Sequence, residues 1–164
     1  MKKQRGMYEY DTEEIEIESL KYAEMKVEDI KKVIPFYIEY YNNHEGSCWN
    51  PKTAYKRIHQ VMTMEESFAL LVKNASEIIG FAMGYYKQYD DIVSYVLEEI
   101  VIASTFQNKG IGSALLQTIE TCVKSKGAAC MELLSVKDEM HEHFYGKAKF
   151  ATAKNFVPKV KWFV

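Results

Sequence analysis

The stretch from Leu97 to Leu116 constrains the fold of this chain more than any other part of the sequence. It has the pattern of an apolar strand, a short polar loop and a helix whose first turn carries Gly110 and Gly112. The first N–H groups of a helix have no partner inside the helix, so they attract a phosphate group. Glycines lack the β-carbons that would keep a pyrophosphate away from this backbone, and Lys109 adds a positive charge. The sequence therefore predicts a phosphate-binding turn between a strand and a helix.

Two common nucleotide-binding loops do not fit this turn. A Walker A loop needs G-x-x-x-x-G-K-S/T, and no such run occurs in the sequence. The dinucleotide-binding pattern G-x-G-x-x-G needs a third glycine where Leu115 stands. Glycine-rich helix starts are common, so the ligand must be identified from the surrounding sequence.

Hydrophobic spacing divides the N-terminal half of the chain into a strand and two helices. Weak alternation predicts a first strand over Ile15–Met25, and apolar residues three and four apart predict a helix over Val27–Tyr41. Pro35 should kink or interrupt this helix, because proline lacks an N–H and crowds the preceding turn. A loop at residues 42–46 precedes a second helix, predicted over Pro51–Met64.

The rest of the chain is predicted to alternate between strands and helices. We expect strands at 67–73, 77–88, 92–103, 129–136 and 155–164, a hairpin turn at 74–76, and helices at 107–126 and 138–147. Gly80 and Gly84 indicate a β-bulge or a close approach of a neighbouring backbone. The order β-α-α-β-β-β-α-β-α-β predicts one mixed α/β domain over residues 13–164, after a loose arm at residues 1–12.

Two segments of the sequence together resemble the GCN5-related N-acetyltransferase (GNAT) superfamily. Gln107-Asn108-Lys109-Gly110-Ile111-Gly112 fits every fixed position of that family's loop, Q/R-x-x-G-x-G/A. Phe144-Tyr145-Gly146-Lys147-Ala148-Lys149-Phe150 is similar to the family's F-Y-x-K-x-G-F segment. The two motifs stand at the usual separation, and the resemblance covers roughly residues 15–164.

This resemblance implies a twisted, mostly antiparallel sheet whose two central strands splay apart, with acetyl-CoA as co-substrate between them. The pantetheine arm would pair with the exposed strand edge as an added strand does, and the pyrophosphate would lie on the N–H groups of residues 108–113. The implied cofactor-binding residues are Ile100, Val101, Ile102, Gln107, Asn108, Lys109, Gly110, Ile111, Gly112, Ser113, Asp138 and Tyr145.

Transfer of an acetyl group to an amine needs a neutral amine, a stabilised oxyanion and a proton for the departing thiolate. Tyr145 stands at the family's general-acid tyrosine, and a phenol can supply that proton. A chain with 12 tyrosines also allows Tyr145 to be a core aromatic residue. Three positions depart from the family pattern: Asp138 replaces a common asparagine, His141 a small residue and Lys149 a glycine.

Glu98 and Glu99 are the candidates for attracting a cationic amine and relaying its proton. Neighbours on a strand point to opposite faces, so alternation predicts that only one of them faces the cleft. We predict that this one is Glu98, with Glu99 as the fallback. Both could instead be charges at a strand edge.

The N-terminal third supplies aromatic and acidic residues that could shape the acceptor site. An aromatic and acidic mixture suits a cationic amine through cation–π and charge attraction, although aromatic residues at helical spacing are more often part of a core. The candidates are Tyr37, Glu39, Tyr40, Tyr41, Glu45 and Trp49.

Composition and charge exclude several other classes of protein. The chain has 164 residues and a net charge of −2, which does not favour nucleic-acid binding. No apolar run reaches the roughly 18 residues of a membrane span, and no secretory leader is evident. The widely spaced Cys48, Cys122 and Cys130 are predicted to be buried or half-buried in a reducing cytoplasm, and no Cys/His spacing suits a metal site.

The sequence therefore predicts a cytoplasmic N-acetyltransferase that transfers an acetyl group to a primary amine of a small molecule, amino acid or peptide. A GNAT-like module that binds an acyl-CoA or a protein partner without turnover is the alternative. The sequence leaves a homodimer open.

Overall fold

The computed structural model of the protein describes residues 16–163, so the arm predicted at residues 1–12, Ile15 and Val164 lie outside the described residues. The strands and α-helices, in chain order, are β1 (Lys21–Glu24), α1 (Ile30–His44), α2 (Pro51–Met62), β2 (Ser67–Asn74), β3 (Glu77–Gln88), β4 (Val93–Ile102), α3 (Ile111–Ser125), β5 (Cys130–Glu132) and α4 (Glu139–Lys147).

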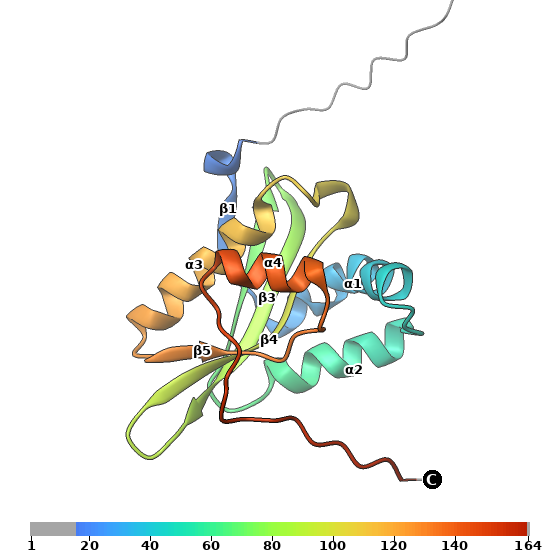
Figure 1. Ribbon diagram of the computed structural model, residues 1–164. Helices are drawn as coiled ribbons and strands as arrows, with labels where there is room; N and C mark the ends of the chain where they lie inside the picture. Colours follow the sequence, from blue (N-terminus) through green and yellow to red (C-terminus); the bar gives the residue numbers. More distant parts are fainter. Residues whose placement is uncertain (1–15, 164) are drawn as a thin grey trace, which may run out of the picture.

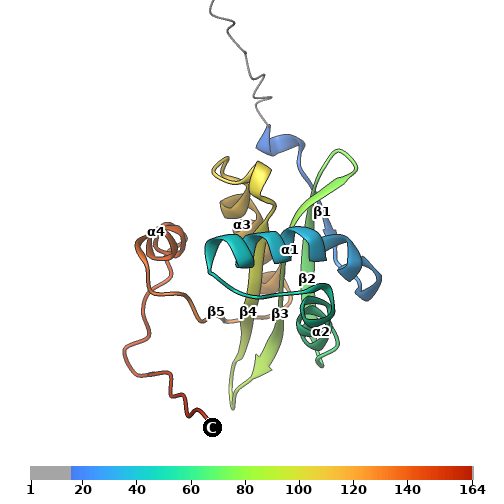
Figure 2. The same cartoon turned by 90° about the vertical axis from the view of Figure 1, so that its right-hand side faces the viewer.

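The five strands form one sheet in the order β1-β2-β3-β4-β5. All neighbours are antiparallel except β4 and β5, which run parallel. Helices α1 and α2 cover one face of the sheet and α3 covers the other (Figures 1 and 2). Helix α4 lies near the edge of the sheet that β5 forms. This arrangement confirms the predicted mixed α/β class.

Each face of the sheet has its own apolar core, because side chains alternate along the strands. Leu71, Phe81 and Val101 point toward α1 and α2, where they meet Ile30 and Ile58. On the opposite face α3 packs its buried residues against the sheet. Those of α3 are Ile111, Leu115, Leu116, Ile119 and Val123.

Strands β4 and β5 separate after a short paired stretch. Their register runs only from Ser94 with Cys130 to Val96 with Glu132. Beyond that point one edge of β4 stays paired with β3, while the edge toward β5 loses its strand partner. Two neighbouring strands therefore splay apart as predicted, but β5 is the edge strand of the sheet formed by the described residues and not a central strand.

A β-bulge lies in β4 beside this splay. Glu99 pairs with Met83 and Leu97 pairs with Gly84, so Glu98 is an extra residue without a partner on β3. Gly84 also allows close approach, because a β-carbon there would lie 2.0 Å from the Val96 carbonyl oxygen. Both properties predicted for the glycines of β3, a bulge and a close approach, are thus observed at Gly84.

Two N-terminal predictions differ from the structure. Residues Ile17–Ser19 form a 3₁₀ turn, in which the Ser19 N–H and hydroxyl both donate to the Glu16 carbonyl, so β1 begins only at Lys21. Pro35 does not interrupt α1, which continues to His44. Its ring lies on the exposed side of the helix, while Val33 and Phe36 are buried against the sheet and hold the helix in place.

Two later elements are shorter than predicted. Helix α3 starts at Ile111 rather than Gln107, because Asn108 and Gly110 adopt φ angles of 59° and 79° that no α-helix contains. Strand β5 ends at Glu132 rather than Val136, because its only strand partner turns away there.

The strand predicted at residues 155–164 is wrong for the described residues 155–163, which form no strand. This segment has no backbone partner, and Pro158 cannot donate a hydrogen bond to one. Its apolar side chains are largely solvent-exposed, with Trp162 86% exposed.

Two of the three cysteines differ from the prediction of burial. Cys48 and Cys130 are exposed, and only Cys122 is half-buried.

Among the helices within residues 16–163, none combines the length and apolar character that crossing a membrane requires.

Candidate active site

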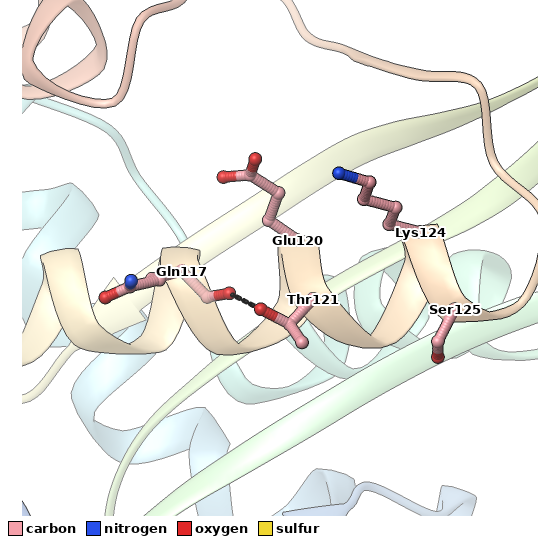
Figure 3. A pocket seen from close by; sticks show the side chains of 5 residues that line it. All are labelled: Gln117, Glu120, Thr121, Lys124 and Ser125. Atoms are coloured by element: carbon pink, nitrogen blue, oxygen red, sulfur yellow. Dashed lines mark hydrogen bonds between the residues drawn. The ribbon is translucent and has the colours of Figure 1, made fainter.

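Two depressions on the described surface are candidates for the site. One, of about 450 Å³, follows the solvent-facing side of α3. Figure 3 shows its lining side chains, Gln117, Glu120, Thr121, Lys124 and Ser125, all on this one helix. The other, of about 280 Å³, lies where β4 and β5 splay apart and is lined from α1, β4 and α4. We assign the site to the second, which we call the cleft, because several elements converge their functional groups there.

The start of α3 presents a row of backbone N–H groups. From Asn108 to Ser113 none of these groups donates to another of the described residues, and Ala114 is the first to do so, to the Gly110 carbonyl. No side chain caps the helix start at Gly110. Because unpaired amides at a helix start bind phosphate oxygens, this turn is chemically suited to hold a phosphate group.

The open edge of β4 continues from this turn into the cleft. Residues Ile100, Val101 and Ile102 pair with β3 on one side only. The Gln107 side chain donates to the Ile102 carbonyl over 2.8 Å, which ties the loop to the end of this edge. An extended, amide-bearing ligand arm can add to such an edge as a further strand.

An arginine joins the two candidate carboxylates at the other end of the cleft. Arg57 of α2 donates from Nη2 to Glu98 Oε2 over 2.6 Å and from Nε to Glu99 Oε1 over 3.1 Å. Tyr41 donates to Glu99 Oε2, and the Tyr37 hydroxyl lies 3.4 Å from Glu99 Oε1. Glu99 is buried and Glu98 is partly exposed, so the two carboxylates share a guanidinium but differ in access to solvent.

The alternation argument for these two residues is wrong at this point of the strand. Both Glu98 and Glu99 line the cleft and both bind the same guanidinium. The reason is the bulge, which places an extra residue in β4 and so disrupts the regular alternation of side chains. Which carboxylate engages the acceptor remains a prediction.

Burial of Glu99 shifts its titration. Burial raises the pKa of this carboxyl, and the Tyr41 hydrogen bond and the Arg57 charge only partly oppose that effect. Burial raises the pKa values of Tyr37 and Tyr41, and the charge of the nearby Glu99 carboxylate raises them further. These phenols therefore stay protonated and act as donors.

Tyr145 reaches the cleft from α4. It is half-buried, and its ring meets those of Phe144 and Phe150 at centroid distances of 5.0 and 5.6 Å. Burial, followed by nearby Tyr40 and Glu99, raises the pKa of the phenol to about 12. Tyr145 thus packs as a core aromatic residue does, yet its phenol lines the cleft and holds its proton at neutral pH.

Most of the aromatic and acidic candidates of the N-terminal third also gather at the cleft. Tyr37, Tyr40, Tyr41, Glu45 and Trp49 all line it. Glu39 does not, because it accepts a hydrogen bond from the Ser104 hydroxyl instead.

The first turn of α4 holds a carboxylate–imidazole pair. Asp138 caps the helix by accepting from the His141 N–H, and its carboxylate also lies 2.8 Å from His141 Nδ1. His141 lines the cleft, and its ring stacks near that of Tyr145 at 6.4 Å between centroids. Lys149, at the end of the same segment, has φ of 66°, a conformation that favours the glycine it replaces.

The sequence prediction missed Arg57 as a part of the site. A signal was present, because Arg57 follows Ala54 by three residues and so shares the buried face of α2 with Ala54, Ile58 and Val61. A charged residue on an apolar helix face needs a buried partner of opposite charge. The sequence alone could not show that the partners come from β4.

Comparisons with known proteins agree with this geometry. The Acetyltransferase (GNAT) family matches residues 31–150. An uncharacterised protein of Bacillus subtilis (strain 168), YxbD, is 29% identical over 97 residues, a match that spans 55% of this chain and 61% of that protein.

Solved structures share the fold at low sequence identity. A possible acetyltransferase of Clostridium difficile 630 superposes with a TM-score of 0.75 at 14% identity, over 88% of this chain and 99% of that one. Ribosomal-protein-alanine N-acetyltransferase of Brucella melitensis biovar Abortus 2308 has a TM-score of 0.67 at 15% identity, over 88% and 99%. The aminoglycoside acetyltransferase meta-AAC0020, from an uncultured soil metagenomic sample, has a TM-score of 0.66 at 13% identity, over 90% and 97%. Since the family match covers well over half of the sequence and the fold agrees with it, this chain belongs to the GNAT family of acetyltransferases.

Proposed function

We propose that the protein is an acetyl-CoA-dependent N-acetyltransferase that transfers the acetyl group to a primary amine by direct attack on the thioester. One observation carries this proposal: the open edge of β4 links the unpaired amides at the start of α3 to a cleft that holds Tyr145 and two carboxylates. The amides would contact the phosphates of one extended co-substrate, and the side chains of the cleft would contact its thioester.

Each group in the cleft has a defined task in this reaction. Bound acetyl-CoA supplies a thioester whose carbonyl carbon the amine attacks. Tyr145, with a pKa of about 12, gives its proton to the departing thiolate. Glu98 attracts the ammonium form of the acceptor, because its carboxylate is the more solvent-accessible of the pair.

The lining of the cleft favours a cationic acceptor. Glu45, Glu98 and Glu99 supply three carboxylates, against which Arg57 supplies one positive charge. Aromatic rings that line the cleft can add cation–π attraction. Solved relatives named as acetyltransferases of aminoglycosides and of a ribosomal-protein alanine support an amine as the acceptor class. Small amines, amino acids and peptide amines all remain within the proposal.

A thiol-release assay tests the proposal directly. Purified protein is incubated with acetyl-CoA and a panel of mono-, di- and polyamines, amino acids and short peptides, and free CoA thiol is followed over time. Release that depends on both acetyl-CoA and an amine supports the enzyme. Tight acetyl-CoA binding by calorimetry without release from any amine would instead indicate the non-catalytic acyl-CoA-binding module.

A further inference from the structure

The two carboxylates of β4 are poorly suited to accept the proton of the acceptor amine. Glu98 is engaged with the Arg57 guanidinium, which donates to its Oε2 over 2.6 Å. Glu99 is buried and receives hydrogen bonds from Tyr41 and Arg57. Both residues can attract a positive charge, but neither presents an unengaged, accessible oxygen pair.

His141 has the geometry that these carboxylates lack. It sits on the same face of α4 as Tyr145, four residues earlier, and its side chain is 15% exposed within the cleft lining. Its Nδ1 lies 2.8 Å from both oxygens of Asp138, while Nε2 makes no hydrogen bond with any residue between 16 and 163. The imidazole is therefore held at one nitrogen and open at the other.

The Asp138 carboxylate determines which nitrogen of His141 carries the proton. A backbone hydrogen bond from His141, followed by the side-chain contact with the same residue, lowers the pKa of Asp138, so this carboxyl is ionised and can only accept. Nδ1 must then be the N–H donor, and in the neutral ring Nε2 keeps the lone pair. A carboxylate that orients an imidazole in this way is the arrangement that general-base histidines use.

We propose that His141 is the general base of the reaction, with Asp138 as the residue that positions it. This inference rests on the proposed N-acetyltransferase function. His141 Nε2 first takes a proton from the acceptor ammonium and passes it to solvent. The neutral amine nitrogen then forms a bond to the thioester carbonyl carbon, and His141 Nε2 takes the second proton that this nitrogen loses. The carbon–sulfur bond then breaks, and Tyr145 gives its proton to the thiolate. Solvent returns a proton to Tyr145 and removes one from His141, which restores both residues.

The charged and titratable groups around His141 come from four elements and their flanking loops. On α1 and the loop after it are Tyr37, Tyr40, Tyr41 and Glu45, on α2 Arg57, on β4 Glu98 and Glu99, and on or before α4 Asp138, Glu139, Glu142 and Tyr145. Most of the charged groups are carboxylates, and Asp138 is the one in direct contact with the imidazole.

The test compares three variants on the amine that the thiol-release panel identifies. His141→Gln should lower kcat/KM by about 10²–10³ at neutral pH, the range of one acid–base group. The loss should shrink as pH rises toward 10, because the amine then arrives already deprotonated. His143→Gln, an exposed histidine of the same helix, is the matched control and should change nothing.

Asp138→Asn separates catalysis from helix capping. Asparagine caps a helix as well as aspartate does, so stability should hold. Activity should fall about tenfold or more, because the amide no longer enforces the reactive tautomer. The loss should fall on kcat and leave acetyl-CoA affinity unchanged, whereas a merely structural role would weaken both.

Calorimetry with acetyl-CoA and a melting curve for each variant show whether binding and folding are intact. If the wild type and the His141→Gln variant release thiol at equal rates, His141 is not the general base. The proposed N-acetyltransferase function would still hold. A pH-independent loss in His141→Gln would also overturn it, since a structural role predicts no rescue at high pH. A wild type that binds acetyl-CoA but acetylates no amine would remove the function itself.

Discussion

The two ends of the proposed co-substrate site, the turn before α3 and the cleft, are built in different ways. The phosphate end consists of consecutive backbone N–H groups from Asn108 to Ser113, in one loop and one helix turn. The acceptor end consists of side chains from α1, α2, β4 and α4, which are far apart in the sequence. A site made of local backbone can be identified from a motif, whereas a site made of assembled side chains depends on packing.

The acceptor end should therefore be sensitive to single functional groups. Tyr145→Phe keeps the ring and its packing against Phe144 and Phe150 but removes the proton. We expect kcat to fall by about 10²–10⁴ with little change in melting temperature. The measurement is kcat from a thiol-release assay, under conditions where the chemical step limits turnover. An unchanged kcat would show that another group protonates the thiolate.

The phosphate end should respond to backbone shape and charge together. Gly110→Asp places a carboxylate against the phosphates at a residue with φ of 79° and should weaken acetyl-CoA binding by about 100-fold. Gly110→Ala carries the same backbone strain without the charge, so it separates the two causes. Calorimetric affinities of both variants are the readout. Equal affinity of Gly110→Asp and wild type would place the pyrophosphate elsewhere.

Because the bulge in β4 brings both Glu98 and Glu99 to the cleft, single variants can test which of them contacts the acceptor. Glu98→Gln should reduce kcat/KM for a cationic acceptor by roughly tenfold, the effect of about 1.4 kcal/mol, and leave acetyl-CoA affinity unchanged. Glu99→Gln should affect folding more than acceptor binding, because Glu99 is the buried partner. A larger kinetic loss in Glu99→Gln would assign the acceptor contact to that residue.

Variants of Arg57 measure how much the acceptor end contributes to the unfolding free energy. Arg57→Met leaves two neighbouring carboxylates without their shared cation and should cost about 1–3 kcal/mol of unfolding free energy, reduced from fully buried values because Arg57 is 31% exposed. Adding Glu99→Gln to Arg57→Met should recover part of the loss, since one unpaired charge is then removed. Urea unfolding of the single and double variants measures this coupling, and purely additive losses would rule out the shared pair.

The raised pKa of Glu99 predicts a pH dependence of the unfolding free energy, which is the smallest of the expected effects. Between its ordinary value of 4.5 and its raised value, the folded state holds a proton that the unfolded state has released. Stability due to this group is therefore full below pH 4.5 and falls as pH rises through the raised pKa. Unfolding free energies from pH 4 to 8 should show that Glu99→Gln lacks this decline. Parallel pH curves for the variant and the wild type would contradict it.

Local pattern predicted most of the fold, and its two errors among the later strands share one cause. The hydrophobic spacing located all four α-helices and the strands β2, β3 and β4, because amphipathic periods of 3.6 and 2 are properties of the segment itself. The failures are β5, cut short at Glu132, and residues 155–163, which form no strand. A strand needs a backbone partner, and a single segment does not reveal whether one is in reach.

The same division holds for the site. The sequence by itself determined the α3 turn, because that turn depends on residues adjacent along the chain, and a motif match singled out Tyr145. Only the tertiary structure decided that Arg57 joins Glu98 and Glu99, and that a bulge brings both carboxylates to one side. It also decided that His141, held by Asp138, faces the cleft with one nitrogen unengaged. Long-range packing fixes these side chains, and the sequence spacing of residues 57, 98 and 141 carries no information about that packing.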